Sequence, residues 1–229
     1  MRAGARFDAE ETRRYTAAAN WEPLAEGDPA DLRSFYAATP GTALLHGGPF
    51  AYISSNSELL GWAMERATGR TYAQLVSDLL WRPMGAESEA YISLDRKGLA
   101  RCTGGICAGA RDLARLGQLV LDGGARDGRE VIAPAWLADM RDGGDAKAWQ
   151  DGEWARVFPY PQMRYRGGWY VVDSQPAMLF AMGVYGQNLF VDAANGIVIA
   201  KLSHHDLAFD YAAQMLTHKA VGEIRRCLS

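Results

Sequence analysis

The last third of the chain changes from helical to extended patterning, and this change most limits the folds that the chain can adopt. From Gly167 onward, short apolar and β-branched runs alternate with turn-forming residues, a pattern that predicts strands. The predicted strands are Trp169–Val172, Ala177–Met182, Asn188–Val191 and Ile197–Leu202, with turns at Asp173–Pro176, Gly183–Gly186 and Asp192–Gly196. Because such short connections suit antiparallel neighbours, we expect an antiparallel meander.

Helical patterning dominates the chain before the strands. The predicted helices are Ser57–Ala67, a segment from Thr71 to about Trp81, Arg111–Asp122, Pro134–Arg141 and a short one near Pro29–Tyr36; Glu89–Leu94 is predicted to be a strand. Apart from that short helix, residues 1–50 are polar, loop-rich and without a confident long element. A last amphipathic helix, Leu207–Leu228, could cover one face of the meander. This order of elements indicates the α+β class.

Length and charge exclude several classes of protein. A chain of 229 residues can form one substantial domain, so we expect a single domain over 1–229, mostly helical or loop in 1–160 and β-meander plus helix in 161–229. The net charge of −3 gives no reason to expect nucleic acid or an anionic membrane as a partner. No run approaches the roughly 18 apolar residues of a membrane span.

The cysteines and histidines show no metal-ligand spacing. Cys102, Cys107 and Cys227 are an odd number, so reduced thiols are expected, and Cys102 and Cys107 are interpreted as small residues packed near a Gly-Gly turn. His204-His205 is expected to form a surface turn. No metal or other cofactor is therefore expected.

A tyrosine followed by small polar residues precedes the Ser57–Ala67 helix. The segment is Tyr52-Ile53-Ser54-Ser55-Asn56, and we expect it to form a short loop. A phenol held beside hydroxyl and amide groups can relay a proton, and those groups can orient a substrate. A loop tyrosine taken alone is more often structural than catalytic, so the surrounding sequence must decide between the two roles.

The surrounding sequence resembles a known enzyme family. Phe50–Ala86 is similar to the class C β-lactamase-related serine hydrolases, closest to the branch with 6-aminohexanoate-dimer (nylon oligomer) hydrolase and related carboxylesterases. Gly104–Gly117 and Gly183–Asp192 resemble further blocks of that branch in the same order, so the resemblance covers about the whole chain. It implies a β-lactamase/penicillin-binding-protein-like fold, in which an antiparallel sheet is flanked by helices.

The resemblance also implies catalytic roles. In this family a serine attacks an amide or ester carbonyl, and a lysine three residues later and a tyrosine of the second motif handle its proton. Tyr52 matches that tyrosine. Ser54 matches the second catalytic position of the same motif, two residues after the tyrosine. β-Lactamases usually have Asn at the position of Ser54, whereas the nylon-oligomer branch has Ser, so the resemblance favours amide or ester substrates over β-lactams.

Two other segments match substrate-binding positions of the family. The triplet Val184-Tyr185-Gly186 corresponds to the third motif, in which a backbone N–H serves as an oxyanion donor; a plain hairpin turn is the alternative. The triplet lacks the usual Lys or His, which again disfavours β-lactams. Thr103 matches a pocket-lining position, with a turn hydroxyl as the alternative. Tyr15 is the only tyrosine near the position of the family's substrate-holding tyrosine, but its spacing does not match.

The chain lacks the family's nucleophile. No serine is followed three residues later by lysine; Ser93 comes nearest, with Arg96, and arginine stays protonated and cannot accept the serine proton. No Gly-x-Ser-x-Gly elbow is present either. In the family, Ser-x-x-Lys lies upstream of every block matched here. We therefore expect Met1 to be an internal methionine of a longer hydrolase, and this portion alone to be inactive.

Three functions remain open at this stage. The first is a serine amidase or esterase for small substrates that acts together with the missing N-terminal part. The second is a hydrolase-derived binding domain that has lost catalysis, and the third, which Ser54 disfavours, is a β-lactam-recognising protein. The sequence leaves open the substrate, the compartment, with a preference for the cytoplasm, and the oligomeric state, for which a homodimer is one option.

Overall fold

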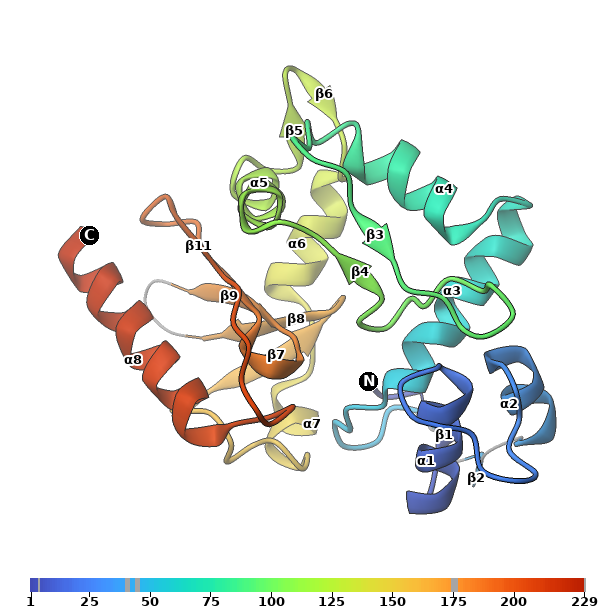
Figure 1. Cartoon of the computed structure of the whole chain (residues 1–229). Helices are drawn as coiled ribbons and strands as arrows, with labels where there is room; N and C mark the ends of the chain where they lie inside the picture. Colours follow the sequence, from blue (N-terminus) through green and yellow to red (C-terminus); the bar gives the residue numbers. More distant parts are fainter. Residues whose placement is uncertain (4, 40–41, 44–45, 174–176, 229) are drawn as a thin grey trace. The chain divides into compact units, whose positions relative to one another are not determined.

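The computed structural model describes residues 1–3, 5–39, 42–43, 46–173 and 177–228 (Figure 1). Their contacts define two compact units: a first unit of Met1–Gly48, Tyr52–Ser77 and Ala90–Cys107, and a second unit of Pro49–Ala51, Asp78–Glu89 and Ala108–Ser229. Each unit has its own apolar core. The single domain expected over 1–229 stays a prediction, and its 161–229 part lies wholly in the second unit.

The first unit contains short helices and two small antiparallel strand pairs. Its elements are β1 (Ala5–Arg6) paired with β2 (Thr42–Ala43), α1 (Ala9–Ala18), α2 (Leu32–Ala38), α3 (Ser54–Thr68), α4 (Tyr72–Val76), and β3 (Tyr91–Ile92) paired with β4 (Ile106–Cys107). Helix α2 confirms the short helix expected near Pro29–Tyr36. The predicted strand Glu89–Leu94 is too long: its ladder with β4 covers only Tyr91 and Ile92, after which Ser93 bonds to Gly105 and Arg101, and Leu94 forms an isolated bridge with Ala100.

Helix α1 was not predicted. Asp8 caps it through a reciprocal pair of hydrogen bonds: the Glu11 N–H donates to Asp8 Oδ1 (2.8 Å), and the Asp8 N–H donates to Glu11 Oε2 (2.9 Å). Its buried face consists mainly of alanines and Tyr15, which pack against Leu32 and Phe35 of α2. This packing forms the core of the first unit.

Helix α3 confirms the helix predicted at Ser57–Ala67 but begins three residues earlier, at Ser54. Ser54, Ser55 and Asn56 therefore form its first turn, and the expectation of a loop up to Asn56 was wrong. The helix ends where Gly69 adopts a left-handed conformation (φ 68°), which glycine does without steric cost. Its buried positions include Ser55, Glu58 and Gly61, an unusually polar set.

The helix predicted from Thr71 to about Trp81 is also present. Thr71 and Gln74 form the expected capping box at the start of α4, and the chain continues as a π-helical turn over Ser77–Trp81. Pro83 follows this turn, as expected for a residue that cannot continue a helix.

The second unit is built on a five-stranded antiparallel sheet. The strands are β7 (Met163–Arg166), β8 (Trp169–Val172), β9 (Met178–Met182), β10 (Asn188–Asp192) and β11 (Ile197–Lys201), in the order β11-β10-β9-β8-β7. The meander and its four predicted strands are confirmed, with ends that differ by at most one residue. Strand β7 was missed. Of the turn predicted at Asp173–Pro176, residues 174–176 lie outside the described residues.

Helices cover both faces of this sheet. The remaining elements of the unit are α5 (Ala110–Leu121), α6 (Pro134–Asp142), α7 (Ala146–Gln150), α8 (Tyr211–Leu228) and the hairpin of β5 (Ala125–Arg126) and β6 (Arg129–Glu130). Leu189 and Val191 of β10 contact the α5 position Gly117, whereas the neighbouring Asn188 and Asp192 bond to α8. Since successive strand residues point to opposite faces, α5 and α8 lie on opposite sides of the sheet.

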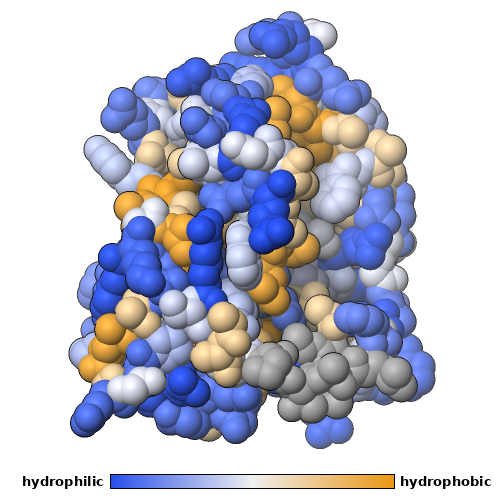
Figure 2. Space-filling model, turned by 90° about the vertical axis from the view of Figure 1, so that its right-hand side faces the viewer, coloured by the Kyte–Doolittle hydropathy of each residue, from blue (hydrophilic) through white to orange (hydrophobic). Residues whose placement is uncertain are grey.

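The helix predicted at Leu207–Leu228 is therefore confirmed as a cover for one sheet face, although it begins later, at Tyr211; α8 runs alongside the strands in Figure 1. Figure 2 shows a largely hydrophilic molecular face on which apolar side chains gather in places. No helix in the described part of the chain has both the length and the apolar character needed to cross a membrane.

Candidate active site

The predicted site residues belong to both compact units. Tyr52, Ser54 and Thr103 lie in the first unit, whereas Val184, Tyr185 and Gly186 lie in the second. The structure joins Ser54 and Thr103 by a hydrogen bond within the first unit, and the triplet forms a local arrangement of its own.

Tyr52 lies two residues before the first residue of α3. Its side chain is half-buried, and this burial raises the pKa of the phenol. The phenol is therefore protonated at neutral pH. It can donate a proton or a hydrogen bond, and it would need a neighbouring cation to accept one.

Ser54 and Thr103 are joined by a hydrogen bond. The Thr103 hydroxyl donates to the backbone carbonyl of Ser54 over 2.8 Å, which ties the segment before β4 to the first turn of α3. The Ser54 carbonyl is thus occupied by a side chain 49 residues away in sequence. This contact places the two predicted positions side by side, close to Tyr52 in the chain.

A buried glutamate lies beneath this contact. Glu58 is only 4% exposed, and its carboxyl group accepts hydrogen bonds from the backbone amides of Cys102 (2.6 Å) and Thr103 (3.1 Å). The Tyr15 hydroxyl donates to the same group over 3.4 Å. Burial raises the pKa of Glu58, and the two amide bonds oppose that rise. Sequence reasoning missed Glu58 and assigned no role to Tyr15.

Arg101 precedes the two amides that Glu58 binds. It is 4% exposed, and its guanidinium carbon lies 3.9 Å from the centre of the Trp21 ring, a cation–π contact. One guanidinium nitrogen donates to the Thr103 carbonyl over 3.3 Å. Burial lowers the pKa of Arg101, and the charge of Glu58 opposes that change. Thr103 is therefore held by two buried side chains: its carbonyl accepts from Arg101, and its amide donates to Glu58.

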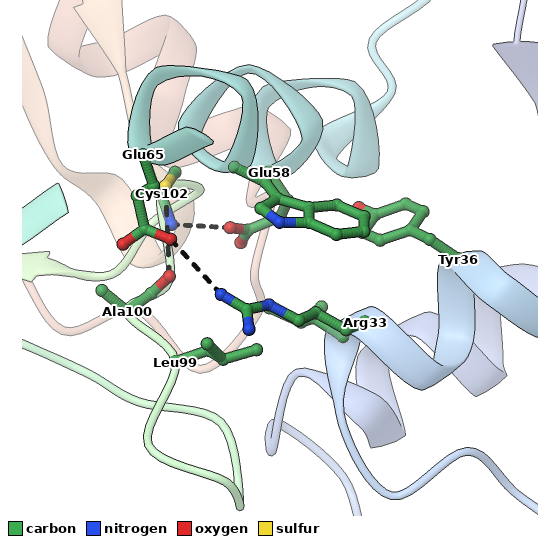
Figure 3. Close-up of a pocket in the computed structure, with 9 residues that line it drawn as sticks. Arg33, Tyr36, Glu58, Glu65, Leu99, Ala100 and Cys102 are labelled. Atoms are coloured by element: carbon green, nitrogen blue, oxygen red, sulfur yellow. Dashed lines mark hydrogen bonds and ion pairs between the residues drawn. The ribbon is translucent and has the colours of Figure 1, made fainter. Parts of the chain in front are cut away.

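Figure 3 shows a pocket along α3 that borders this network. The pocket is small and partly open to solvent, and it is lined by Leu32, Arg33, Tyr36, Glu58, Trp62, Glu65, Leu99, Ala100 and Cys102. Arg33 reaches from α2 toward Glu65 (3.8 Å), and the Tyr36 hydroxyl donates to the Ser55 carbonyl over 2.7 Å. None of the predicted site residues lines this pocket; Glu58 and Cys102 connect it to them.

The triplet Val184–Gly186 forms a single 3₁₀ turn after β9, which confirms the predicted turn. Tyr185 has a left-handed backbone (φ 59°), a conformation uncommon for a bulky residue. Its N–H donates to the Ala208 carbonyl (2.9 Å), and its carbonyl accepts from the His205 N–H (3.2 Å). Because the Tyr185 amide is used in this way, Val184 and Gly186 are the better candidates for an oxyanion donor.

Gly186 is fixed by its neighbours. Its carbonyl accepts hydrogen bonds from Lys201 Nζ (3.0 Å) and Asn188 Nδ2 (3.1 Å). A β-carbon at this position, where φ is 85°, would lie 2.3 Å from Cε1 of the His205 ring. His204 is exposed and His205 is partly buried, and both lie in irregular backbone after β11, so the prediction of a turn at this pair was wrong.

The described residues contain no group of three or more His, Cys, Asp or Glu side chains that could hold a metal ion. The candidate site instead offers a hydroxyl group from Thr103, a phenol from Tyr52 and a carboxyl group from Glu58. Such groups can transfer protons and orient a polar substrate.

Comparison with known proteins defines the class. Residues 1–221 match the family model described as beta-lactamase, so the chain belongs to the β-lactamase family. This confirms both the resemblance and the expected fold class.

Individual relatives narrow the comparison. Over 195 residues the chain is 34% identical to the 6-aminohexanoate-dimer hydrolase of Paenarthrobacter ureafaciens, a match that covers 85% of this chain and 49% of that relative. The chain therefore spans about half the length of this relative. A solved structure of a Bacillus anthracis protein, provisionally named a 6-aminohexanoate-dimer hydrolase, matches with a TM-score of 0.81 and 22% identity, covering 100% of this chain and 57% of that one.

A more distant structure has the same fold. The D-stereospecific amidohydrolase of a Streptomyces species matches with a TM-score of 0.61 and 16% identity, over 93% of this chain and 68% of that one.

Proposed function

We propose that this chain is part of a serine hydrolase that cleaves amide or ester bonds in small substrates of the 6-aminohexanoate-oligomer or carboxylesterase type. The observation that carries the proposal is the arrangement at the start of α3: Tyr52 precedes the helix, and the Thr103 hydroxyl bonds to the Ser54 carbonyl over 2.8 Å. The 34% identical 6-aminohexanoate-dimer hydrolase supports this substrate type.

In the proposed reaction, a serine supplied by a segment outside these 229 residues attacks the carbonyl carbon. Its proton passes by way of a lysine and Tyr52 to the leaving amine or alcohol, and water then releases the acyl group. A protonated Tyr52 phenol suits the donation step, and the ammonium group of the lysine would lower the phenol's pKa for the acceptance step. Ser54 and Thr103 would line the substrate site, and a backbone N–H at Val184 or Gly186 would bind the oxyanion.

An inactive binding domain derived from a hydrolase is the second candidate. The absence of a Ser-x-x-Lys motif in the sequence favours it over an active enzyme for this portion alone. A β-lactam-recognising protein is a third candidate, which fluorescent penicillin labelling of the longer form would support.

The test begins with the coding sequence upstream of the Met1 codon. We expect an open reading frame that supplies Ser-x-x-Lys, and a longer product that hydrolyses p-nitrophenyl esters or the 6-aminohexanoate dimer. An in-frame stop codon close upstream, together with soluble expression of the 229-residue chain, would refute the expectation of a longer enzyme.

Tyr52→Phe should lower kcat of the longer product by about 10²–10⁴-fold, the usual contribution of a positioned acid–base group. Tyr91→Phe is the matched control, because the Tyr91 side chain is 71% exposed and lies on β3. The 229-residue chain should not react with a fluorophosphonate probe. Equal activities of the two variants, or labelling of the short chain, would contradict the proposal.

A further inference from the structure

A buried carboxyl group on a helix is costly to keep, so Glu58 calls for an explanation. Removing a carboxylate from water carries a large penalty unless hydrogen bonds compensate for it. Here the compensation comes from outside the helix, because both amide donors belong to the segment Arg101–Gly105, more than 40 residues later in the sequence. This segment is called the docking loop.

The direction of the side chain explains why Glu58 reaches this loop. Side chains of an α-helix lean toward its N-terminus, so a residue covers the turn that precedes it. Glu58 is four residues after Ser54, and its carboxyl group therefore lies over the first turn of α3, where the docking loop arrives. Figure 3 shows it directed toward the backbone of Cys102.

Two glycines shape this docking, one on α3 and one within the loop. A β-carbon at Gly61 would lie 1.8 Å from the Cys102 sulfur, so only glycine leaves room for that side chain. A β-carbon at Gly105 would lie 2.0 Å from the Arg101 carbonyl, so the loop turns back on itself at that glycine. The loop is thus shaped by its glycine and held at its centre by Glu58.

The result of this docking is the position of Thr103. Its amide is bound to Glu58, its carbonyl to Arg101, and its hydroxyl to the Ser54 carbonyl. Glu58 thus holds the loop backbone beside the first turn of α3, where the Thr103 hydroxyl reaches the Ser54 carbonyl.

We propose that Glu58 is a positioning residue that docks the loop Arg101–Gly105 onto α3 and so places the Thr103 hydroxyl at the start of that helix. Glu58 acts through the loop and not on the substrate. The consequence for catalysis rests on the function proposed above, whereas the docking itself does not.

The direct test is amide hydrogen exchange, measured by NMR, in the chain and in Glu58→Gln. Glutamine offers one acceptor oxygen, and its NH₂ group would face the second amide donor, so the two loop amides cannot both be satisfied. Exchange at Cys102 and Thr103 should become about 10–100-fold faster, because a buried amide donor would be left without its acceptor.

Glu65→Gln is the matched control. It changes the same functional group on the same helix, but Glu65 accepts from the Tyr72 amide (2.8 Å) and not from the loop. Exchange at Cys102 and Thr103 should be unchanged in this variant. Unchanged exchange in Glu58→Gln, or equal acceleration in both variants, would overturn the proposal.

A kinetic test applies to the longer product. Glu58→Gln and Thr103→Val should each lower kcat/KM, and the double variant should be no worse than the poorer single variant, because both disturb one position. Additive losses would mean that Glu58 acts through general stability and would overturn the positioning role. If the longer product has no activity, the proposed function fails, and the exchange measurement still decides the docking.

Discussion

Acidification from pH 7 to pH 5 should destabilise the second unit through one buried histidine. His218 on α8 is only 3% exposed, and the rings of Phe180 and Phe190 lie 5.0 and 5.3 Å from its own. The Tyr160 hydroxyl lies 2.8 Å from Nδ1, and Nε2 lies 3.2 Å from the Gln214 amide nitrogen. Since that amide nitrogen is a donor, Nε2 is assigned as the acceptor, and a second proton there would face another donor.

The magnitude follows from the difference in proton affinity between the two states. Burial lowers the pKa of His218 to about 4, compared with about 6.5 in an unfolded chain. Between these values the unfolded state binds more protons than the folded state, so stability falls as the pH falls. The loss should be about 2 kcal/mol between pH 7 and pH 5, and about 3 kcal/mol once the pH is below 4.

Urea denaturation at pH 7 and pH 5 measures this loss. His218→Gln removes the titrating group, so its free energy of unfolding should depend less on pH, by about 2 kcal/mol over that interval. Carboxylates with lowered pKa values, such as Asp31, contribute equally to both proteins and cancel in the comparison. His204→Gln, at an exposed position, should behave like the unmodified chain.

Two results would refute this reasoning. One is an equal pH dependence of the unmodified chain and His218→Gln. The other is an NMR titration of the folded chain in which the His218 ring protonates near pH 6.5, the ordinary value.

Three further substitutions test packing and capping by chemical denaturation. Gly61→Ala should cost about 1–3 kcal/mol because its β-carbon would lie 1.8 Å from the Cys102 sulfur; an added Cys102→Ala should recover only part of the loss, since the Cys102 β-carbon would still lie 2.8 Å away, and a neutral Gly61→Ala would contradict the contact. Gly117→Ala should cost a similar amount, about 1–3 kcal/mol, because its β-carbon would lie 2.5 Å from Val198 Cγ1 and 2.9 Å from Leu189 Cδ1; Val198→Ala should relieve the first clash and recover part of the loss, and no recovery would point to another cause. Asp8→Ala should cost about 1 kcal/mol by removing the α1 cap, and no loss would mean that the cap is dispensable.

The second unit could be predicted well because its signals are local. Strands β8 to β11 have buried apolar residues and are joined by short connections. Both the apolar runs and the turn-forming residues between them are therefore visible in the sequence. Strand β7 was missed because Arg164 and Arg166 interrupt its pattern. In the folded chain these arginines pair with Asp173 (2.6 Å) and Asp139 (2.7 Å), partners that only the tertiary structure supplies.

Helix α1 was missed for a different reason. Its capping box, Asp8 with Glu11, is a clear local signal, but its buried face is mostly alanine. Alanine contributes little to a hydrophobic period, so α1 has a weak apolar stripe although Ala17, Ala18 and Ala19 are fully buried. For α1, the capping box was better evidence for a helix than the spacing of apolar residues, which was misleading.

The candidate site divides in the same way. Tyr52, Ser54 and Thr103 could be proposed as site residues from sequence blocks in a fixed order, because each block is a short local pattern. Glu58 could not, because hydropathy predicts that a glutamate on a helix is exposed. Its burial depends on two backbone amides that the chain brings to it from more than 40 residues away. The only available signal was that Glu58 lies three residues from both Ser55 and Gly61, a spacing that puts these small residues and Glu58 on one face of the helix.

The turn Val184–Gly186 shows how the sheet can sustain a strained backbone. A left-handed non-glycine residue such as Tyr185 costs roughly 1–2 kcal/mol, so its surroundings must compensate. Strands β10 and β11 supply Asn188 and Lys201, which both bind the Gly186 carbonyl, and Asn188 is itself bonded to Gln214 of α8. The same alternation that sends Leu189 toward α5 sends Asn188 toward α8. The packing of the sheet therefore also determines the conformation of the turn, and a half-exposed tyrosine is held there in a conformation that it would not adopt alone.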